Sequence, residues 1–408
     1  MNWTVGKRSV HLSEEPVLAL HSDAPEAPAA AWRDPKRWLW LFGLLIPAFP
    51  FLSWGLVNAT GLRLFWWTGT LVLYVVFPVV DHLIGKDSAN PPDSAIAHLE
   101  QDRYYRWCTY LYLPLQYAGL VLGCWLITRG DLSLVDRIGL TLTLGGVAGI
   151  AINTAHELGH KTEALERRLS RIALAQTWYG HFYVEHNHGH HIRVATPEDP
   201  ASARLGESFW RFLPRTVLGS LTSAWHLEKR RLTRRGRSVW SPRNRILGSW
   251  ALSFVLFAGL ALAFGPGVLP YLAVQAVFGF CLLEVINYTE HYGLQRERTA
   301  SGRYERCAPR HSWNSDNVAS NVFLYHLQRH SDHHANPTRR YQSLRHFDEA
   351  PEMPTGYAGM IVLAYVPPLW RRVMDPRVLA HYDGDVTRAN LQPSRRARLL
   401  ARYGAAAG

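Results

Sequence analysis

The chain has 408 residues, of which 48% are hydrophobic, and it carries a formal net charge of +12 at pH 7. No recognition motif or stacking pattern for nucleic acid accompanies this charge, so nucleic-acid binding is not supported. The four cysteines form no CxxC pair, which argues against both a disulfide scaffold and a thiolate metal site.

Three regions follow one another along the chain. Residues 1–35 are polar, rich in Ala, Pro and Glu, and lack an apolar core before a cleavage site, so we expect a flexible arm rather than a signal peptide. Residues 36–385 contain the apolar segments and the histidine motifs, and we expect them to form one membrane domain. Residues 386–408 are predicted to be a C-terminal tail.

Uncharged stretches of membrane-spanning length recur along the domain. A helix that rises about 1.5 Å per residue needs roughly 20 residues to cross the hydrocarbon core, and about 17 to 25 are tolerated. The last stretch is divided by Gly265-Pro266-Gly267, and its second half is long enough only if it continues through Glu284 to about Thr289. We therefore predict an all-α integral membrane protein with six transmembrane helices, in the stretches 38–57, 64–80, 107–128, 138–155, 246–264 and 268–289.

Lysine and arginine are concentrated on one side of these helices. With the N-terminus placed inside, only Arg63, Arg129 and Arg137 of the 44 basic residues fall outside or at the outer edge. Because positive residues favour cytoplasmic segments, we expect both termini and two catalytic regions, 155–245 and 290–385, to be cytoplasmic. The short apolar run 357–370 is too brief to span, and we expect it at the membrane interface or packed against the inner region.

Nine histidines fall in four clusters, each just past the end of an uncharged stretch. The clusters are the motifs HELGHK, EHNHGHH, NYTEHYG and LQRHSDHH. Side chains three and four residues apart share one face of a helix, so each cluster can point its imidazoles into one volume at the inner mouth of the bundle. The nine are His156, His160, His186, His190, His191, His291, His330, His333 and His334.

These imidazoles predict a metal centre with more than one ion. Nitrogen-rich sites without thiolates suit zinc, copper, iron or nickel. Nine imidazoles divide naturally between two ions, five on one and four on the other or a similar split. Because a pocket embedded in lipid favours apolar substrates, for which hydrolysis has little use, we favour a non-haem centre of two iron ions that activates O₂.

Two other classes stay open at this point. HELGH matches the zinc-protease pattern, in which Glu157 would act as the base, although one zinc needs only about three protein ligands. A metal transporter or storage protein is a non-enzymatic alternative, but a transporter would place its ligands along a path through the membrane midplane.

Several other residues are candidates around the site. Carboxylates adjacent to the histidines can accept a hydrogen bond from an imidazole and fix its tautomer. Glu284 lies within a predicted span, where an ionisable side chain is costly and usually functional, so we predict a catalytic role; a helix-to-helix hydrogen bond is the alternative. Trp54, in the middle of the first span, is a candidate to line a substrate channel. The adjacent carboxylates are Glu157, Glu185, Glu290 and Asp332.

The four motifs resemble the signature sequences of membrane alkane monooxygenases, which share a superfamily with fatty-acid desaturases and xylene monooxygenases. NYTEHYGL and LQRHSDHHANPTRRYQSLR are most similar to the alkane hydroxylase branch, and the resemblance covers roughly residues 35–385. It implies that the nine histidines bind two irons and that the enzyme uses O₂ to hydroxylate the terminal carbon of medium-chain n-alkanes to primary alcohols. A fatty-acyl desaturase or a xylene-type methyl hydroxylase is the alternative within the superfamily.

The resemblance also implies an electron donor and a location. The donor would be rubredoxin, a small acidic protein, either separate or fused beyond the tail, and the location the bacterial inner membrane. The chain itself has no flavin or nicotinamide motif. The basic run 229–237, with Arg339 and Arg340, could bind an acidic donor by charge complementarity. Contact with lipid phosphates is an equal alternative for 229–237.

Overall fold

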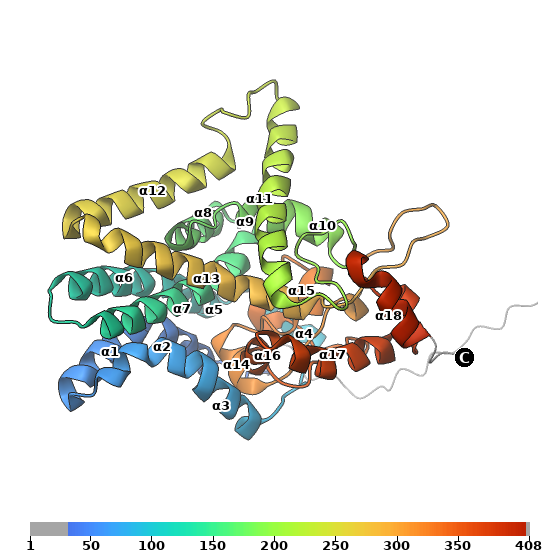
Figure 1. The fold of residues 1–408 in the computed structure, drawn as a ribbon, viewed down its shortest axis with the longest axis horizontal. Helices are drawn as coiled ribbons and strands as arrows, with labels where there is room; N and C mark the ends of the chain where they lie inside the picture. Colours follow the sequence, from blue (N-terminus) through green and yellow to red (C-terminus); the bar gives the residue numbers. More distant parts are fainter. Residues whose placement is uncertain (1–31, 405–408) are drawn as a thin grey trace, which may run out of the picture.

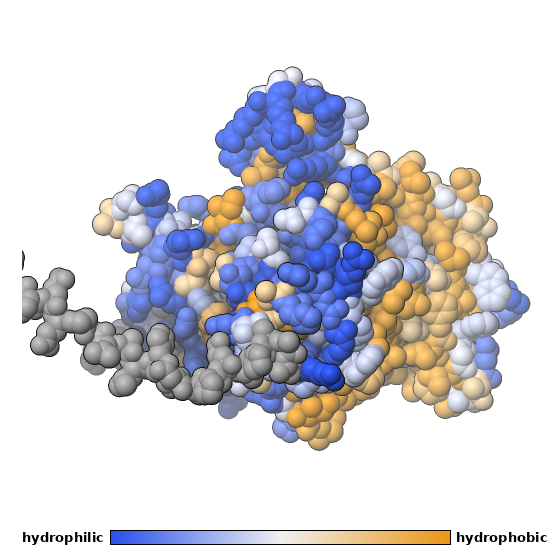
Figure 2. All heavy atoms as spheres, turned by 180° about the vertical axis from the view of Figure 1, so that it is seen from behind, coloured by the Kyte–Doolittle hydropathy of each residue, from blue (hydrophilic) through white to orange (hydrophobic). Residues whose placement is uncertain are grey.

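A computed structural model describes residues 32–404, and this part of the chain is all helical, without an extended strand. Residues 1–31 of the predicted arm and 405–408 of the predicted tail lie outside the described residues. In Figure 1 the long helices lie side by side in one half of the molecule, and shorter helices gather at their ends in the other half. Figure 2 shows apolar residues covering the first half and polar residues covering much of the second.

Six helices are long and apolar enough to cross a membrane, which confirms the predicted number. They extend past the uncharged stretches because their ends accommodate charge: Arg63 Nε lies 2.9 Å from Asp136 Oδ2, and Ser133 caps the helix that contains Asp136. The six are Leu39–Thr60, Arg63–Ile84, Arg103–Thr128, Leu134–Gly159, Arg245–Phe264 and Pro266–Glu290.

These spans are made of the following helical elements. The first contains α1 (Leu45–Thr60), and the second contains α2 (Thr68–Leu71), one π-helical turn η3 (Val72–Val76) and α3 (Phe77–Ile84). The third contains α5 (Arg103–Tyr110) and α6 (Tyr112–Thr128), and the fourth is α7 (Leu134–Gly159). The last two are α12 (Arg245–Phe264) and α13 (Leu269–Glu290).

Helix α7 is the central span and packs closely on α13. A Cβ atom at Gly149 would lie 2.8 Å from the Gly279 carbonyl oxygen, and one at Gly145 would lie 2.9 Å from the Gln275 carbonyl oxygen. Small residues of this kind let two membrane helices approach each other closely. The close packing brings together the C-terminal ends of α7 and α13, which carry the first and third histidine motifs.

The regions between and after the spans are also helical. Helix α11 is long, and the segments around it are mostly short helices that fold over the histidine-bearing ends of the spans. These elements are α4 (Asp93–Gln101), α8 (Ala164–Ala173), α9 (Phe182–Glu185), α10 (His191–Arg193), α11 (Phe209–Thr233), α14 (Val318–Phe323), α15 (His330–Ala335), α16 (Tyr357–Ala364), α17 (Pro367–His381) and α18 (Arg396–Tyr403).

The end of the described chain packs on this inner region. The apolar run 357–370 forms α16 and the start of α17, and Tyr357, Met360 and Trp370 are fully buried, so the run packs against the body of the protein. Residues 386–404, which the sequence set apart as a tail, are joined to it as well: the Leu205 amide donates to the Asn390 carbonyl (2.7 Å).

Candidate metal centre

The first two histidines lie at the C-terminal end of α7. His156 is in its last turn and His160 is the residue that caps it, so their rings lie on one face with centroids 4.9 Å apart. The side chain of Asn153, one turn earlier, donates to the Leu324 carbonyl (2.6 Å) and thereby ties α7 to the segment that leads into α15.

The second motif forms a π-helical turn, η5 (His186–His190), rather than the α-helical turn that its spacing suggested. In a π-helix, residues five apart lie above one another. His186 and His191 therefore face each other, with their Nε2 atoms 3.0 Å apart, and the adjacent His190 points to a different place.

The last two motifs complete the site. His291 immediately follows α13, and α15 carries His330 and His334 one turn apart, with their Nε2 atoms 2.9 Å apart. His333, on the neighbouring face of α15, instead approaches His191, with Nε2 atoms 3.1 Å apart.

The nine predicted histidines thus come together as two adjacent groups, one of five and one of four. Within each group the potential ligand atoms all lie within 4.8 Å of one another. The division into five and four agrees with the split expected from the sequence. The first group is His156, His160, His186, His191 and His333, and the second is His190, His291, His330 and His334.

The donor atoms fit two bound metal ions. Nitrogens about 2.1 Å from one metal stand roughly 3 Å apart when they subtend a right angle, and the closest Nε2 pairs match this spacing. The Nε2 atoms of His156, His160, His190 and His291 are buried without a hydrogen-bond partner. Such orphaned buried nitrogens are costly unless a ligand satisfies them.

Six of these rings are held neutral, as metal ligands must be, whereas at His190 the contact with Asp199 outweighs burial and raises the pKa of the imidazole. Burial lowers the pKa of His160, His186 and His191 well below its usual range, and the neighbouring imidazoles lower it further. The same causes act on His330, His333 and His334.

Two carboxylates and one carbonyl contact the imidazoles directly. Asp199 Oδ2 accepts from His190 Nδ1 (2.9 Å), and Glu290 Oε2 lies 3.2 Å from His330 Nε2. Burial alone raises a carboxyl pKa, but His190 and Ser202 lower that of Asp199 to about 2, so Asp199 is an ionised acceptor. The carbonyl is that of His311, whose oxygen lies 3.3 Å from His291 Nδ1.

Of the four predicted carboxylates, only Glu290 touches a predicted ligand. Glu157 pairs with Lys161 (3.0 Å), Glu185 pairs with Arg193 (2.5 Å), and Asp332 pairs with Arg339. These three hold neighbouring backbone and side chains in place. Sequence reasoning missed Asp199 because it lies nine residues after His190, outside the histidine motif.

Glu284 and Trp54 lie away from the two histidine groups. Glu284 accepts from Tyr179 (2.7 Å), Thr216 (2.9 Å) and Asn287 (3.2 Å), which is the helix-to-helix arrangement considered as its alternative role. Trp54 packs edge-on against Trp125 and lines a separate hollow with Arg63 and Arg129, near the end of the bundle where α7 begins. His156 lies at the other end of α7.

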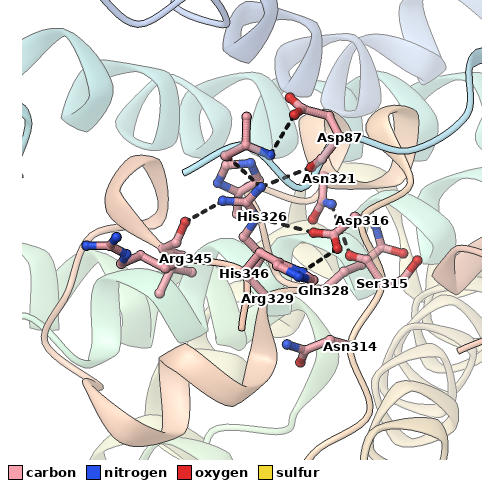
Figure 3. A network of polar contacts seen from close by, with 12 residues as sticks. Asp87, Asn314, Ser315, Asp316, Asn321, His326, Gln328, Arg329, Arg345 and His346 are labelled. Atoms are coloured by element: carbon pink, nitrogen blue, oxygen red, sulfur yellow. Dashed lines mark hydrogen bonds and ion pairs between the residues drawn. The ribbon is translucent and has the colours of Figure 1, made fainter. Parts of the chain in front are cut away.

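A buried arginine fixes the ligand-bearing helix α15. Arg329 directly precedes His330 and is 1% exposed. Its guanidinium donates to the carbonyls of Leu344 (2.8 Å), Asp87 (3.0 Å) and Ala89 (3.1 Å). Figure 3 shows this network together with Asp316 and His346. Asp316, His346 and Glu352 form a third metal-like trio, but Arg329 and Lys86 already neutralise its carboxylates, so we assign it no ion.

A narrow apolar cavity ends at the histidines. It has a volume of about 60 Å³, and its walls come from the second span, α7, α13 and α16. Leu73, Ile150, Leu282 and Ile361 are among its apolar walls, while His156, His186 and His330 lie at its polar end, with Glu290 beside them. The cavity therefore borders both histidine groups.

The fold and site define a helical membrane metalloprotein whose two histidine-lined metal sites lie at the end of an apolar cavity. A family model described as fatty acid desaturase matches residues 137–364. Alkane 1-monooxygenase of Acinetobacter baylyi is 48% identical over 91% of this chain and 92% of its own length. Alkane 1-monooxygenase 1 of Alcanivorax borkumensis is 46% identical over the same shares.

A more distant relative is the xylene/toluene monooxygenase hydroxylase component of Pseudomonas putida, 28% identical over 80% of this chain and 88% of its own. The chain belongs to the alkane 1-monooxygenase family, within the fatty acid desaturase superfamily.

Proposed function

We propose that this protein is a non-haem diiron monooxygenase that converts medium-chain n-alkanes to primary alcohols with O₂ and electrons from rubredoxin. The observation that carries the proposal is the narrow apolar cavity that ends on His156, His186 and His330. The names of the relatives at 48% and 46% identity support an alkane as the substrate. The 28% identity to the xylene/toluene enzyme makes an arene methyl group the less favoured substrate.

The metal ions are proposed to be iron, held by the nine histidines in groups of five and four. When bound, reduced iron would supply the O₂-reducing chemistry that places one oxygen atom in a C–H bond while the other leaves as water. Imidazole suits iron as well as zinc, copper and nickel, so the assignment rests on the oxidative chemistry expected of the family.

The residues of the chain supply positioning and exclusion of water. A cavity of about 60 Å³ is too small for a whole medium-chain alkane, and we propose that the end of the chain is the part that reaches the histidines. Glu290 and His330 both line the cavity, with Glu290 Oε2 3.2 Å from His330 Nε2, and the Tyr357 hydroxyl donates to the other Glu290 oxygen (2.8 Å). We propose that this pair is positioned to pass protons toward the reacting end of the chain.

A basic groove provides a docking surface for an acidic donor such as rubredoxin. It has a volume of about 1010 Å³ and lies between α11 and the segment that holds Asp199. Lys229, Arg230 and Arg234 line it, and Asp199 in its wall contacts His190, so a docked donor would lie close to the second histidine group.

The structure corrects one part of the predicted docking surface. Arg339 is paired with Asp332, and Arg340 is buried against Glu163 and Glu166, so neither is free to contact a partner. The run 229–237 contributes only in part, because Arg231 is bound to Glu228.

The cellular location proposed is the bacterial inner membrane, with the histidine groups on the cytoplasmic side. The six spans and the concentration of Lys and Arg on one side of them support this orientation.

Metal content and product formation test the function. Anaerobically purified protein should contain two irons per chain and should form 1-octanol from octane when rubredoxin, its reductase and NADH are supplied. One zinc per chain and no O₂ consumption would overturn the proposal. Unsaturated acyl products without octanol would favour a desaturase.

Salt dependence and charge reversal test the donor separately. The rubredoxin-coupled rate should fall steeply with added salt, whereas the rate with a chemical reductant should not. The double variant Arg230→Glu with Arg234→Glu should weaken coupling to rubredoxin, and Arg372→Glu, an exposed residue outside the groove, is the matched control. A flat salt response would remove this surface from the proposal.

A further inference from the structure

A second apolar hollow opens on the exposed surface of the helix bundle. It has a volume of about 700 Å³ and lies between the second span, α7, α13 and the start of α11. Val274 and Val277 at its rim are each 50% exposed. The walls are hydrocarbon or aromatic, and the hydroxyls of Tyr74 and Tyr365 are the main polar groups among them. We call this hollow the lateral groove.

The lateral groove and the cavity beside the histidines share three elements on which their wall residues are adjacent or one helical turn apart. In the second span, Tyr74 lines the groove and the adjacent Leu73 lines the cavity. In α13 the corresponding neighbours are Cys281 and Leu282. The two spaces are therefore back to back, separated by about one layer of side chains.

The third shared element is α16 with the residue that follows it. Ile361 lines the cavity, and Tyr365, one helical turn later, lines the lateral groove. The same short helix thus contributes to both spaces. If the C-terminal turn of α16 were displaced, the lateral groove would open into the cavity beside the histidines.

Tyr74 and Tyr365 join the second span to the C-terminal end of α16. Their hydroxyl oxygens lie 3.2 Å apart, and Tyr74 also packs edge-on against Phe278 with ring centroids 6.4 Å apart. Tyr365 stacks on Trp210 (5.7 Å between centroids). A single hydroxyl pair between aromatic rings is a contact that side-chain rotation can break without disturbing a helix.

Tyr74 also lies at the centre of η3, the π-helical turn in the second span. Such turns interrupt the regular hydrogen-bonding ladder of a helix and often mark functional sites. Here the turn lies where Leu73 faces the cavity and Tyr74 faces the lateral groove.

We propose that the lateral groove is the entrance by which an alkyl chain passes from the hydrocarbon of the bilayer to the metal centre, with Tyr74 and Tyr365 as its gate. The inference rests on the proposed function, because it assumes that an apolar chain must reach the histidines. The occupant is an unbranched alkane. An alkane suits the apolar walls and the exposed rim of the groove, and only about one layer of side chains separates the groove from the cavity beside the histidines.

Blocking the groove tests the entrance. Val277→Trp fills the rim without removing a hydrogen bond, and Val255→Trp, at a 66% exposed position of α12 outside the groove, is the matched control. The first variant should lower kcat/KM for octane by about tenfold or more with unchanged metal content, and the control should not. Wild-type kcat/KM in Val277→Trp would overturn the proposal.

A thiol in the groove gives a test that does not depend on turnover. Cys281 lines the groove, Cys307 is the other partly exposed cysteine, and Cys108 and Cys124 are buried. In a Cys307→Ser variant, octane should slow the modification of Cys281 by phenylmercury, and the Val277→Trp change should remove this protection. Absence of protection by octane, or equal protection by any detergent or lipid chain, would overturn the entrance.

The two tests separate the entrance from the function. Octanol formation by the wild type decides the proposed function. Protection of Cys281 from phenylmercury by octane tests the entrance independently. It does so even if the wild type forms no octanol, or if Val277→Trp loses its metal through misfolding.

Discussion

His190 and Asp199 form a buried pair, with His190 Nδ1 donating to Asp199 Oδ2 over 2.9 Å, and this contact leaves His190 Nε2 facing the second histidine group. Ser202 Oγ donates to the same carboxylate oxygen (2.7 Å), so the acceptor is itself held in place. One tautomer of His190 is thereby selected, and it is the tautomer with a free Nε2 lone pair.

Asp199→Ala should reduce iron content or activity by about 10- to 100-fold, because His190 loses the acceptor that orients it. Asp199→Asn is the matched control. Its amide oxygen can still accept from His190 Nδ1, so it should lose less iron and less activity than Asp199→Ala. Iron titration and octane turnover measure the two effects. Full iron content and turnover in Asp199→Ala would contradict the assigned role.

Metal removal should destabilise the inner region. Nine imidazoles, seven of them buried, would lose the metal ions that they bind, and a metal present at 1,000 times its dissociation constant stabilises the native state by about 4 kcal/mol. Chelation should therefore lower the thermal unfolding temperature in detergent, and anaerobic addition of ferrous iron should restore it. An unchanged melting curve after the metal has been removed would argue against a structural contribution from the two sites.

Arg329→Met should lower both stability and metal content. The change leaves the carbonyls of Asp87, Ala89 and Leu344 without their donor, and the buried Leu344 carbonyl alone should cost about 1–3 kcal/mol of stability. His330 is the next residue, so its position should loosen as well. Arg372→Met, at an exposed position, is the control and should behave as wild type in thermal unfolding and iron analysis.

Glu284→Gln should retain most activity, whereas Glu284→Ala should lower stability. Both carboxylate oxygens are engaged with Tyr179, Thr216 and Asn287, and glutamine keeps the size and one acceptor oxygen. Comparing octane turnover with thermal unfolding separates the two roles. Loss of turnover in Glu284→Gln at normal stability would restore the catalytic role predicted from the sequence.

Ile361→Phe should shift the preference toward shorter alkanes, because the larger side chain shortens the cavity. Val362→Phe, on the same helix but 40% exposed and outside the cavity, is the matched control. Rates measured over a series of n-alkanes give the comparison.

Trp54→Ser tests the predicted channel residue in the same series. If a long alkane extends past the cavity toward α1, removal of the indole should increase the rate on longer chains. An unchanged chain-length profile would leave Trp54 with packing against Trp125 as its role.

The number of spans and the gathering of the histidines were predictable because both depend on local pattern. Runs of apolar residues of membrane length specify helices whatever their neighbours are, and histidines at their inner ends have few other places to lie. Gly265-Pro266-Gly267 marked the break between the last two spans for the same reason, since it interrupts the helix locally.

The pairing of individual histidines was harder to predict from the sequence, because it depends on a helix type that residue spacing does not reveal. The motif EHNHGHH suggested that His186 and His190 pair at one α-helical turn, whereas the π-turn pairs His186 with His191. Contacts between segments far apart in the chain could not be predicted from the sequence either. Arg340 was expected to be exposed, but Glu166 of α8 buries it in an ion pair.

The π-turn at η5 has a consequence for how the centre is loaded. Because it directs the consecutive residues His190 and His191 to different groups, a single peptide unit bridges the two sites. An ion bound at one site orders the backbone that presents a histidine to the other site. Binding of the second ion therefore loses less conformational entropy than binding of the first. Metal uptake should accordingly be cooperative, with few chains holding a single ion at half saturation.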